Sequence, residues 1–566
     1  MKTKRTPGRL IATAALAMLA PAALLADATP KPKVLMVMMD GVRGDVVENA
    51  PMPNLLALRE GRWRAGYNGF STLTAHTLYD ARPSSAANHS AIVTGVTAEK
   101  SRIFKNGDTP KGNFAAWPSW LSRLVEAKPG TKALYAYSWE GDIALSPHPN
   151  VQNLRLPSVC DVNWPIVPGS YAKYASTIPK IMASADAPDA VVYFIDIADL
   201  GGHRSGFYPY GKEYLHDARL VDRIIGDTLA AIASRPQFAN EDWLFLITSD
   251  HGGCGRAHGI WGGHATTIPV IVAGRHVPQG RITGMPRNFD LAPLALAHFG
   301  IDAKGMKLDG LPLGAPSVPK ERGLADGLAA YLPFSETIPA NVVVGNVAAR
   351  AHGKTVSGVD GGLFGKCLRV AADAKGACGV SLDGSEKLAF ENGADFTVAL
   401  WLRLDEPQAL QAPIFANKDW KSGMNPGVVL VGARKTDAVK TPGVCFNCGL
   451  SGDAGRIDMG TFSIDYGEWC FYAVTHRADG VLTVYQGGQD GHLYWIAEDA
   501  SALALKTGLP FWIGQDGTGT CKVSLTGDVD DFALWTRTLT REEVRRIHDE
   551  GRKGRALGTL IKTMTK

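Results

Sequence analysis

The sequence lacks an excess of charge of one sign. Its 566 residues include 59 Lys and Arg against 55 Asp and Glu, which gives a formal net charge of +4. No long basic run precedes the C-terminal segment RKGRALGTLIKTMTK. Proteins that hold nucleic acid through bulk charge carry a concentrated basic patch, so nucleic-acid binding by charge is not expected.

Long apolar runs are also missing after residue 28. No stretch there approaches the run of about 20 apolar residues that a membrane-spanning helix needs, so no membrane span is expected. Residues 1–28 have a basic start, an Ala/Leu-rich stretch and the small-residue pattern ADA, which is typical of a cleaved secretory signal peptide. No cysteine near that point could carry a lipid anchor. We therefore expect a periplasmic or extracellular protein.

Cysteine is scarce, and it falls in even numbers in the two halves. Cys160 and Cys254 lie in the first half, and six cysteines lie in the second. In an oxidising compartment this division predicts disulfides within each domain, although spacing alone cannot give the pairing. Cys445 and Cys448 form a CFNC motif, but a redox or zinc site is the less favoured interpretation because no second pair of that spacing occurs.

The two halves differ in their hydrophobic pattern. In the first half, five short and nearly continuous apolar runs alternate with helical stretches, among them 214–235. Strands covered on both faces, as in parallel sheets, have this composition, so the half is predicted to be an α/β sandwich with a mostly parallel sheet. The apolar runs are KVLMVMMD, KALYAYS, AVVYFIDIAD, DWLFLITSD and IPVIVAG.

In the second half the apolar residues alternate with a period of two. Residues 395–404 place five apolar side chains on one face, and residues 469–488 read as a hairpin around Asp479 and Gly480. Thr540 and Glu543 form a capping box before a short helix. We expect an all-β sandwich here. The predicted organisation is a signal peptide at 1–28, an α/β domain at 30–320, a linker at 321–327, an all-β domain at 328–552 and a basic tail at 553–566.

Acidic residues and histidines gather where strands of the first half are predicted to end. Ligands bind outside the carboxyl ends of strands in open α/β sheets, so these side chains should converge on one crevice. Mixed oxygen and imidazole ligands suit zinc or a similar ion better than magnesium or calcium, and the set is large enough for two metals. The candidates are Asp40, Asp199, His203, Asp250, His251 and His258.

The segment SSAANHSAIVTG at 84–95 opens a predicted helix with two serines. Serines in this position usually cap the free amides of the first turn. A nearby metal could instead favour the alkoxide of one of them and make it a nucleophile. The residues alone leave Ser84 and Ser85 as alternatives.

The motifs VMMDG, SSAANHSAIVTG, DLGGHRSGF, TSDHGG and HG…IPVIVAG, in this order, resemble the alkaline phosphatase superfamily, closest to its type I phosphodiesterase/nucleotide pyrophosphatase branch. The resemblance implies an alkaline phosphatase-like catalytic domain with a nucleophile at Ser85, where the family commonly has Thr. It also implies a phosphate-binding Asn106, twenty-one residues further on. Ala87 departs from the Pro that the family has there.

The same resemblance implies how two divalent ions, zinc by expectation, would be held. One would be bound by Asp199, His203 and His258. The other would be bound by Asp40, Asp250 and His251, with Ser85 as a further ligand. His264 competes with His258, but the family's last histidine is followed by Gly and precedes the next strand by the distance that His258 shows.

Hydrolysis of a phosphate ester through a covalent phosphoserine is the predicted function. A diester is preferred, because Glu140 and Asp142 stand where monoesterases of the superfamily carry cationic groups and would repel a dianion. The alternatives are a phosphomonoesterase or a sulfatase, although the sulfatase Cys/Ser-x-Pro-x-Arg motif is absent.

The second half resembles a laminin-G-like, concanavalin A-like jellyroll, on the segments LAAYLPFSE, DFTVALWLRL and VDDFALWTRTLTREEV among others. Such domains bind glycans or stabilise a neighbour, so a glycan is a possible partner. A surface glycan-binding protein with an inactive first domain is the alternative of another class. Asp528, Asp530 and Asp531 are candidate calcium ligands, with turn and surface acids as the favoured interpretation.

Overall fold

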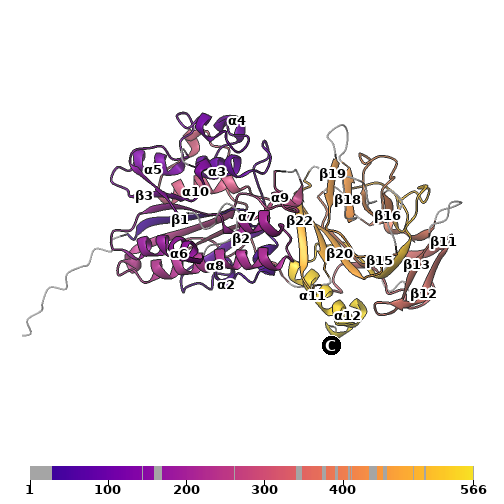
Figure 1. Cartoon of the computed structure of the whole chain (residues 1–566). Coiled ribbons are helices and arrows are strands. Elements are labelled where there is room, and N and C mark those ends of the chain that lie inside the picture. Colours follow the sequence, from indigo (N-terminus) through magenta and orange to yellow (C-terminus); the bar gives the residue numbers. More distant parts are fainter. Residues whose placement is uncertain are drawn as a thin grey trace, which may run out of the picture.

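The computed structural model comprises two domains side by side (Figure 1). It describes residues 29–564 except for short internal segments. The expected signal peptide and Cys160 therefore lie outside the described residues. The segments left out are 143–144, 158–167, 260–261, 321, 339–346, 372–377, 389–392, 406–407, 409–410, 433–442, 450–455, 489 and 502–504.

The first domain is built on one nine-stranded sheet in the order β4-β3-β5-β1-β6-β7-β2-β8-β9. All five apolar runs form strands, which confirms that part of the prediction. Four further strands were not predicted. The strands are β1 Lys31–Met39, β2 Asn68–His76, β3 Ala133–Tyr137, β4 Val151–Arg155, β5 Ala190–Ile195, β6 Glu241–Ser249, β7 Thr267–Gly274, β8 Gly280–Ile282 and β9 Pro316–Ser317.

The sheet is mixed, and its direction changes at β7. Strands β4, β3, β5, β1 and β6 are mutually parallel, whereas β7 is antiparallel to both β6 and β2. The run IPVIVAG was expected in a parallel sheet because both of its faces are apolar. Burial on both faces is present in β7, but it reports coverage by neighbouring layers and not strand direction.

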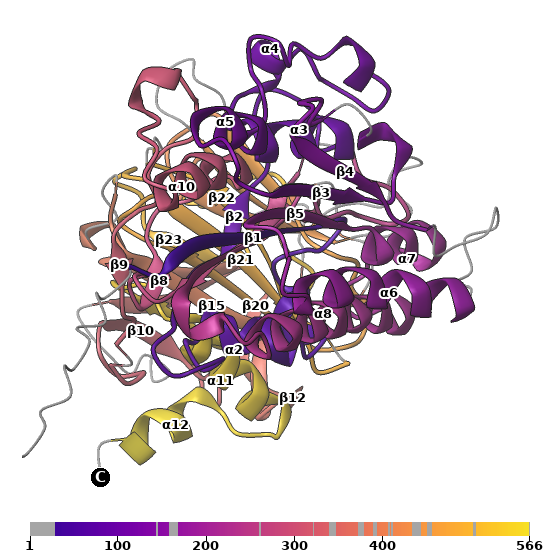
Figure 2. The same cartoon turned by 90° about the vertical axis from the view of Figure 1, so that its left-hand side faces the viewer.

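Helices cover both faces of this sheet (Figure 2). Side chains of β1 alternate between two cores: Leu35 and Val37 pack with α2, α6 and α8, and Met36 and Met38 pack with α3, α5 and α10. The helix predicted at 214–235 is observed as α8. The helices are α1 Val46–Asn49, α2 Pro53–Arg59, α3 Ser85–Thr94, α4 Ala98–Ser101, α5 Trp120–Ala127, α6 Pro168–Ala183, α7 Ile197–Ser205, α8 Lys212–Ala233, α9 Gly263–Thr266 and α10 Leu291–His298.

The second domain is a sandwich of two antiparallel sheets, as expected for a jellyroll. One sheet has the order β12-β13-β24-β15-β20-β21-β22, with β10 also paired to β24, and the other has the order β11-β14-β23-β16-β17-β18-β19. The strands of the first sheet are β10 Leu328–Leu332, β12 Thr355–Gly362, β13 Gly365–Val370, β15 Phe396–Leu404, β20 Cys470–His476, β21 Val481–Gly487, β22 Leu493–Asp499 and β24 Gly527–Trp535. Those of the second are β11 Ala348–His352, β14 Gly379–Asp383, β16 Ala412–Ala416, β17 Val428–Gly432, β18 Val444–Gly449, β19 Arg456–Gly460 and β23 Phe511–Ile513.

The alternating strand, the hairpin and the capping box predicted for this domain are all present. In β15, Phe396, Val398 and Leu400 face the core between the sheets, while Trp401 packs on the opposite face against α11 (Arg541–Arg552). The hairpin of β20 and β21 closes with Gly480 at φ 89°. The capping box of Thr540 and Glu543 starts α11, and α12 (Leu557–Met564) ends the described chain.

Two expectations for the second domain are not supported by the described residues. Its six cysteines form no disulfide among the described residues, so the predicted disulfides are not present there. Cys445 and Cys448, three apart on β18, point to opposite sheet faces. The candidate calcium ligands are buried and engaged by the protein. Asp528 pairs with Arg369 and Arg403, and Asp531 accepts from Tyr331.

The edge strand β22 lies against the first domain, beside α9 (Figure 1). Side chains of the first domain bond to backbone groups of alternate residues along β22. Asn49 donates to Leu493, Asp45 accepts from Trp495, and Thr267 both accepts from and donates to Ala497. The first domain thus satisfies the outer edge of this sheet without adding a strand to it.

An ion-pair network also joins the domains at Glu48 of α1. Its carboxylate pairs with Arg59 of its own domain and with Arg541 and Arg545 of α11, at 2.8, 3.1 and 2.9 Å. Burial raises the pKa of Glu48, but the three guanidinium groups outweigh burial and lower it to about 2.

Within the described chain, no helix has the length and apolar character needed to cross a bilayer.

Glu48→Gln is expected to lower the free energy of unfolding by about 2 kcal/mol at pH 7, because it removes a charged acceptor from three guanidinium groups. The folded-state pKa lies below the ordinary value of 4.5, so this stabilisation is complete above pH 4.5. It is lost as the pH falls towards 2. Urea unfolding of wild type and variant across this range measures both effects. Glu60→Gln, which removes an exposed ion pair with Arg62, is the matched control; equal losses in both variants would contradict the prediction.

Candidate functional site

Two aspartates reach the site from the ends of adjacent parallel strands. Asp40 follows β1 and Asp250 follows β6, and both are buried. Gly41 has φ 72°, and a Cβ placed there would lie 2.7 Å from the Asp199 Cα. A side chain at position 41 would therefore push away the helix that carries Asp199.

Asp199 lies on a helix. The sequence had suggested that it lies at the end of a strand. Strand β5 ends at Ile195, and α7 begins at Ile197. Residues four apart share one face of a helix, so α7 presents Asp199 and His203 together, with Asp199 Oδ2 3.4 Å from His203 Nε2.

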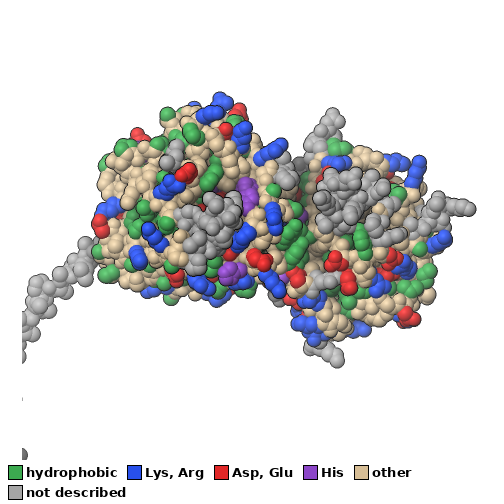
Figure 3. All heavy atoms as spheres, in the orientation of Figure 1, with side chains coloured by type: hydrophobic (Ala, Val, Ile, Leu, Met, Phe, Trp, Pro, Cys, Tyr) green, Lys and Arg blue, Asp and Glu red, His purple; other side chains and the backbone are tan. Residues whose placement is uncertain are grey.

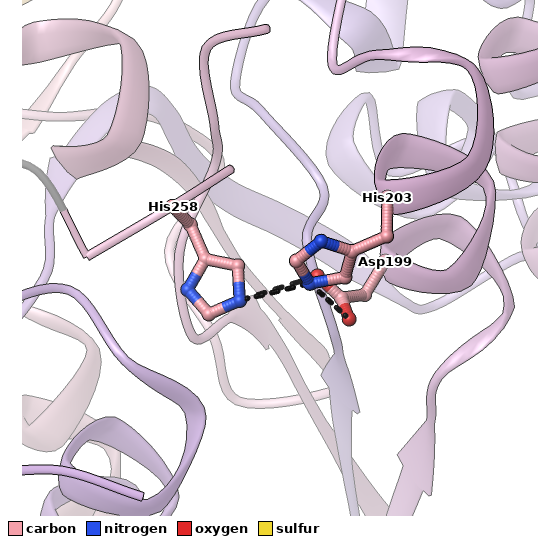
Figure 4. A group of neighbouring side chains, drawn as sticks. All are labelled: Asp199, His203 and His258. Carbon is pink, nitrogen blue, oxygen red and sulfur yellow. Dashed lines mark hydrogen bonds and ion pairs between the residues drawn. The ribbon is translucent and has the colours of Figure 1, made fainter. Parts of the chain in front are cut away.

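His258 completes the first group of candidate ligands (Figure 4). Its Nε2 lies 3.1 Å from His203 Nε2 and 3.8 Å from Asp199 Oδ1. The second group adjoins it: His251 Nε2 lies 3.3 Å from Asp40 Oδ1 and 3.2 Å from Asp250 Oδ2. The structure thus brings all six predicted Asp and His residues together. On the face drawn in Figure 3, histidine side chains reach the surface near the junction of the domains.

The three imidazoles share one hydrogen-bonding arrangement. The Nδ1 atoms of His203, His251 and His258 lie 2.8–3.1 Å from the backbone carbonyls of Arg256, Gly252 and Pro83. A carbonyl can only accept, so each Nδ1 carries the proton and each Nε2 keeps its lone pair. Metal-ligating histidines are commonly oriented in this way, and here all three Nε2 atoms point into the site.

Burial perturbs the ionisable groups of the site. It raises the pKa of Asp199 to about 7 and that of Asp40 well above its usual value, with neighbouring carboxylates adding to the shift of Asp40. It lowers the pKa of His251, and that of His258 to about 3. For Asp250, burial is outweighed by the nearby His251 and His89 imidazoles, and its pKa is lowered. Buried carboxylates gathered this closely repel one another, and a cation would relieve the repulsion.

The site fits divalent cations. Asp40 Oδ1 and Asp199 Oδ1 are buried and have no hydrogen-bond partner among the described residues. Ligand atoms within 4.8 Å of one another come from Asp199, His203 and His258, and from Asp40, Asp199 and His251. Mixed carboxylate and imidazole donors are suited to zinc-type ions.

The two serines at the start of α3 occupy different environments. Ser85 Oγ lies 3.3 Å from His251 Nε2, so its hydroxyl adjoins the metal-ligand set. Ser84 is at the N-cap position, but its side chain makes no capping bond, and its buried Oγ has no partner among the described residues. The capping role considered for these serines is therefore not present.

Asn106, which lies on a later loop, packs next to the start of α3, the helix that begins at Ser85. Its Oδ1 accepts a 3.0 Å hydrogen bond from the Ala86 amide. This bond fixes the orientation of the carboxamide, while the exposed side chain keeps its NH₂ group available as a donor.

His89 was missed at the sequence level. Its Nε2 lies 3.1 Å from Asp250 Oδ2, and its Nδ1 lies 2.9 Å from Asp142, which also accepts from Tyr135. These carboxylates outweigh burial and raise the His89 pKa to about 10, so the charged ring holds Asp250 in place. Its position four residues after Ser85, on the same face of a helix, was the available signal.

Asp142 and Glu140 do not act as the free anions that the diester argument assumed. Asp142 is fully buried and paired with His89, and Glu140 is exposed and paired with Arg155 at 2.6 Å. Helical geometry turns Asp142 inward under α3, which the spacing could not reveal. Neither carboxylate therefore presents an unpaired negative charge that would repel a dianionic substrate, and this part of the prediction is wrong.

His264 is not part of the cluster. Its Nδ1 lies 3.1 Å from the Arg43 guanidinium, and its ring packs on Phe462 of the second domain. Burial and the Arg43 charge lower its pKa to about 3.

Two family models match the chain. The type I phosphodiesterase/nucleotide pyrophosphatase model matches residues 34–254, and the concanavalin A-like lectin/glucanases superfamily model matches residues 376–545. The first domain is type I phosphodiesterase/nucleotide pyrophosphatase-like. This match supports phosphoryl or sulfuryl transfer as the general chemistry of the domain, and it includes every predicted site residue except His258.

Curated relatives are similar over a short region. GPI ethanolamine phosphate transferase 1 of Aspergillus oryzae is 27% identical over 167 residues, and that of Aspergillus fumigatus is 28% identical over 168 residues. Each alignment covers 24% of this chain and 16% of the relative, so the chain spans about a sixth of the length of these relatives.

Solved structures with similarity include a 2-O GAG sulfatase, at 13% identity and a TM-score of 0.40, covering 60% of this chain and 82% of that one. Murine ectonucleotide pyrophosphatase/phosphodiesterase 5, in complex with AMP, has 15% identity and a TM-score of 0.35. That comparison covers 50% of this chain and 97% of the murine chain.

His258→Ala is expected to reduce the bound metal from two ions to one per chain, because it removes an oriented imidazole from a three-residue group. His264→Gln should leave both ions bound, since His264 faces Arg43. Metal analysis of the purified proteins after dialysis measures the content. If His264→Gln loses an ion and His258→Ala keeps both, the metal ligand is His264 and not His258.

Proposed function

We infer that this chain is a two-metal hydrolase of phosphate esters that acts through a covalent intermediate on Ser85. The observation that carries the inference is the 3.3 Å approach of Ser85 Oγ to the Nε2 of His251, inside a buried set of oriented imidazoles and carboxylates. An inactive, purely glycan-binding protein would have no need to keep these groups buried together at the cost of desolvation.

The residues that would hold the ions are Asp199, His203 and His258 for one, and Asp40, Asp250 and His251 with Ser85 for the other. Divalent ions bound there would favour the serine alkoxide and offset the charge of the phosphoryl oxygens. Zinc is the proposed identity because the donors mix imidazole and carboxylate.

Ser85 Oγ would attack phosphorus, forming a phosphoserine while the bond to the leaving alcohol breaks. Asn106, whose carbonyl is fixed by the Ala86 amide, would donate its NH₂ group to a phosphoryl oxygen. His89 would hold Asp250 through both steps, because its ring is clamped between Asp250 and Asp142. Water then hydrolyses the phosphoserine and restores the free serine.

A phosphodiester is the proposed substrate class, and the family match over residues 34–254 is what supports it. Monoester or sulfate ester hydrolysis is the alternative within the same superfamily. Export to a periplasmic or extracellular location is proposed from the pattern of residues 1–28.

Ser85→Ala is expected to lower kcat on bis(p-nitrophenyl) phosphate on the order of a millionfold, because it removes the nucleophile. Ser84→Ala should change kcat less than tenfold, and both variants should keep their metal. The rates on this diester and on p-nitrophenyl phosphate, with metal content measured in parallel, test the nucleophile and the substrate class together. If Ser84→Ala is inactive and Ser85→Ala is active, Ser84 and not Ser85 is the nucleophile. Faster hydrolysis of the monoester would refute the diester preference.

Asn106→Ala is expected to reduce kcat by roughly a hundredfold or more, the usual effect of removing one donor to a developing oxyanion. Asn113→Ala, another Asn in the same connecting region, is the control and should retain activity. Steady-state kinetics on the diester measure both. An unchanged rate for Asn106→Ala would remove this residue from the mechanism.

A further inference from the structure

A cavity of about 530 Å³ lies between the two domains and shares no residue with the metal cluster. The first domain contributes parts of β2 and β8 and the loop after β9, and the second contributes β20, β21 and the start of α11. A second cavity of about 430 Å³ adjoins it, since Arg281, Thr540 and Arg541 line both. Together they form a space large enough for a small organic ligand.

The lining of the larger cavity is strongly cationic. Six basic residues line it against two acidic ones, Asp395 and Asp479. Both acids are already engaged: Asp479 accepts from Arg477, and Asp395 accepts from the Ala478 amide and Thr538. Two of the basic residues also have acidic partners outside the lining, since Arg537 pairs with Glu543 and Arg541 with Glu48. The basic residues are Arg281, Lys320, Arg322, Arg477, Arg537 and Arg541.

Two of these guanidinium groups are crowded together with incomplete compensation. Arg281 has Glu542 as its charged partner at only 3.5 Å, and burial together with the charge of Arg541 lowers the pKa of Arg281 to about 10. Arg541 is 6% exposed and pairs with Glu48 at 3.1 Å, but its buried Nε has no hydrogen-bond partner among the described residues. Clustered, partly desolvated guanidinium groups favour a bound anion, which can accept from several of them at once.

The rest of the lining favours a polyhydroxylated ligand. Hydroxyl side chains from both domains surround the basic residues and can both donate and accept hydrogen bonds. The hydroxyl residues are Thr74, Thr283, Ser317, Thr475, Thr483, Tyr485, Thr538 and Thr540.

We propose that this interdomain cavity binds an anionic sugar, one that carries a phosphate or sulfate ester, with Arg281 and Arg541 on the anion and the threonines on the sugar hydroxyls. This site is separate from the metal site, so its occupation does not depend on hydrolysis. It would hold a charged carbohydrate at the junction of the domains.

Calorimetric titration of full-length, zinc-loaded Ser85→Ala protein with glucose 6-phosphate, glucose 6-sulfate and glucose tests the proposal. The Ser85→Ala background prevents turnover of the probes. Both anionic sugars should bind more tightly than glucose by at least tenfold, and more weakly at high salt because the contacts are ionic. The tighter of the two identifies the preferred ester.

Arg281→Gln and Lys320→Gln, each added to this background, should weaken binding of the anionic sugars, with Arg281→Gln at least tenfold weaker. Arg350→Gln, an exposed arginine on β11 outside the cavity, is the matched control. In the Ser85 protein, neither cavity variant should change kcat on the diester. Lys320 is exposed, so its variant decides the matter if Arg281→Gln fails to fold. Unchanged affinity in the cavity variants, equal binding of glucose, or loss of binding on chelation of the metal would overturn the proposal.

Discussion

The site depends on placing three carboxylates, those of Asp40, Asp199 and Asp250, in one buried pocket. Burial raises the pKa of Asp40 and of Asp199, and the negative charge of neighbouring carboxylates raises both further. The protein offsets part of this effect with the charged ring of His89, which holds Asp250. The remainder is left for cations, and the uncompensated oxygens of Asp40 and Asp199 lie where such cations would bind.

The fold meets this constraint through the order of its strands. Adjacent parallel strands β1 and β6 end together, so Asp40 and Asp250 arrive side by side. The close approach at Gly41 then lets α7 bring Asp199 within reach. Backbone carbonyls around the site fix the proton on each Nδ1, so the ligand atoms are set before any ion arrives. The rigidity of the sheet and the polarity of the loops therefore share the work of preorganisation.

Much of this arrangement could be predicted from the sequence, and the failures have physical causes. The five apolar runs gave strands, and the order of the motifs placed six ligand residues in one crevice. The direction of β7 could not be predicted, because apolar faces report burial alone. The role of Asp142 was misjudged because a short helical turn directs it towards His89. His89 itself escaped notice, since a histidine within an apolar helix is usually an ordinary core residue. Disulfides were inferred from counting cysteines, which carries no information on the directions of their side chains.

The bonds from the first domain to β22 also bear on how this chain avoids aggregation. An exposed edge strand presents unpaired amides and carbonyls that another chain can extend. Here Asn49, Asp45 and Thr267 occupy those groups at every second residue, with side chains that cannot continue a ladder. The neighbouring domain thus blocks the addition of a strand from another molecule to this edge. Separating the two domains would expose the unpaired backbone groups of β22. The solubility of the β-sandwich therefore depends on the presence of the first domain.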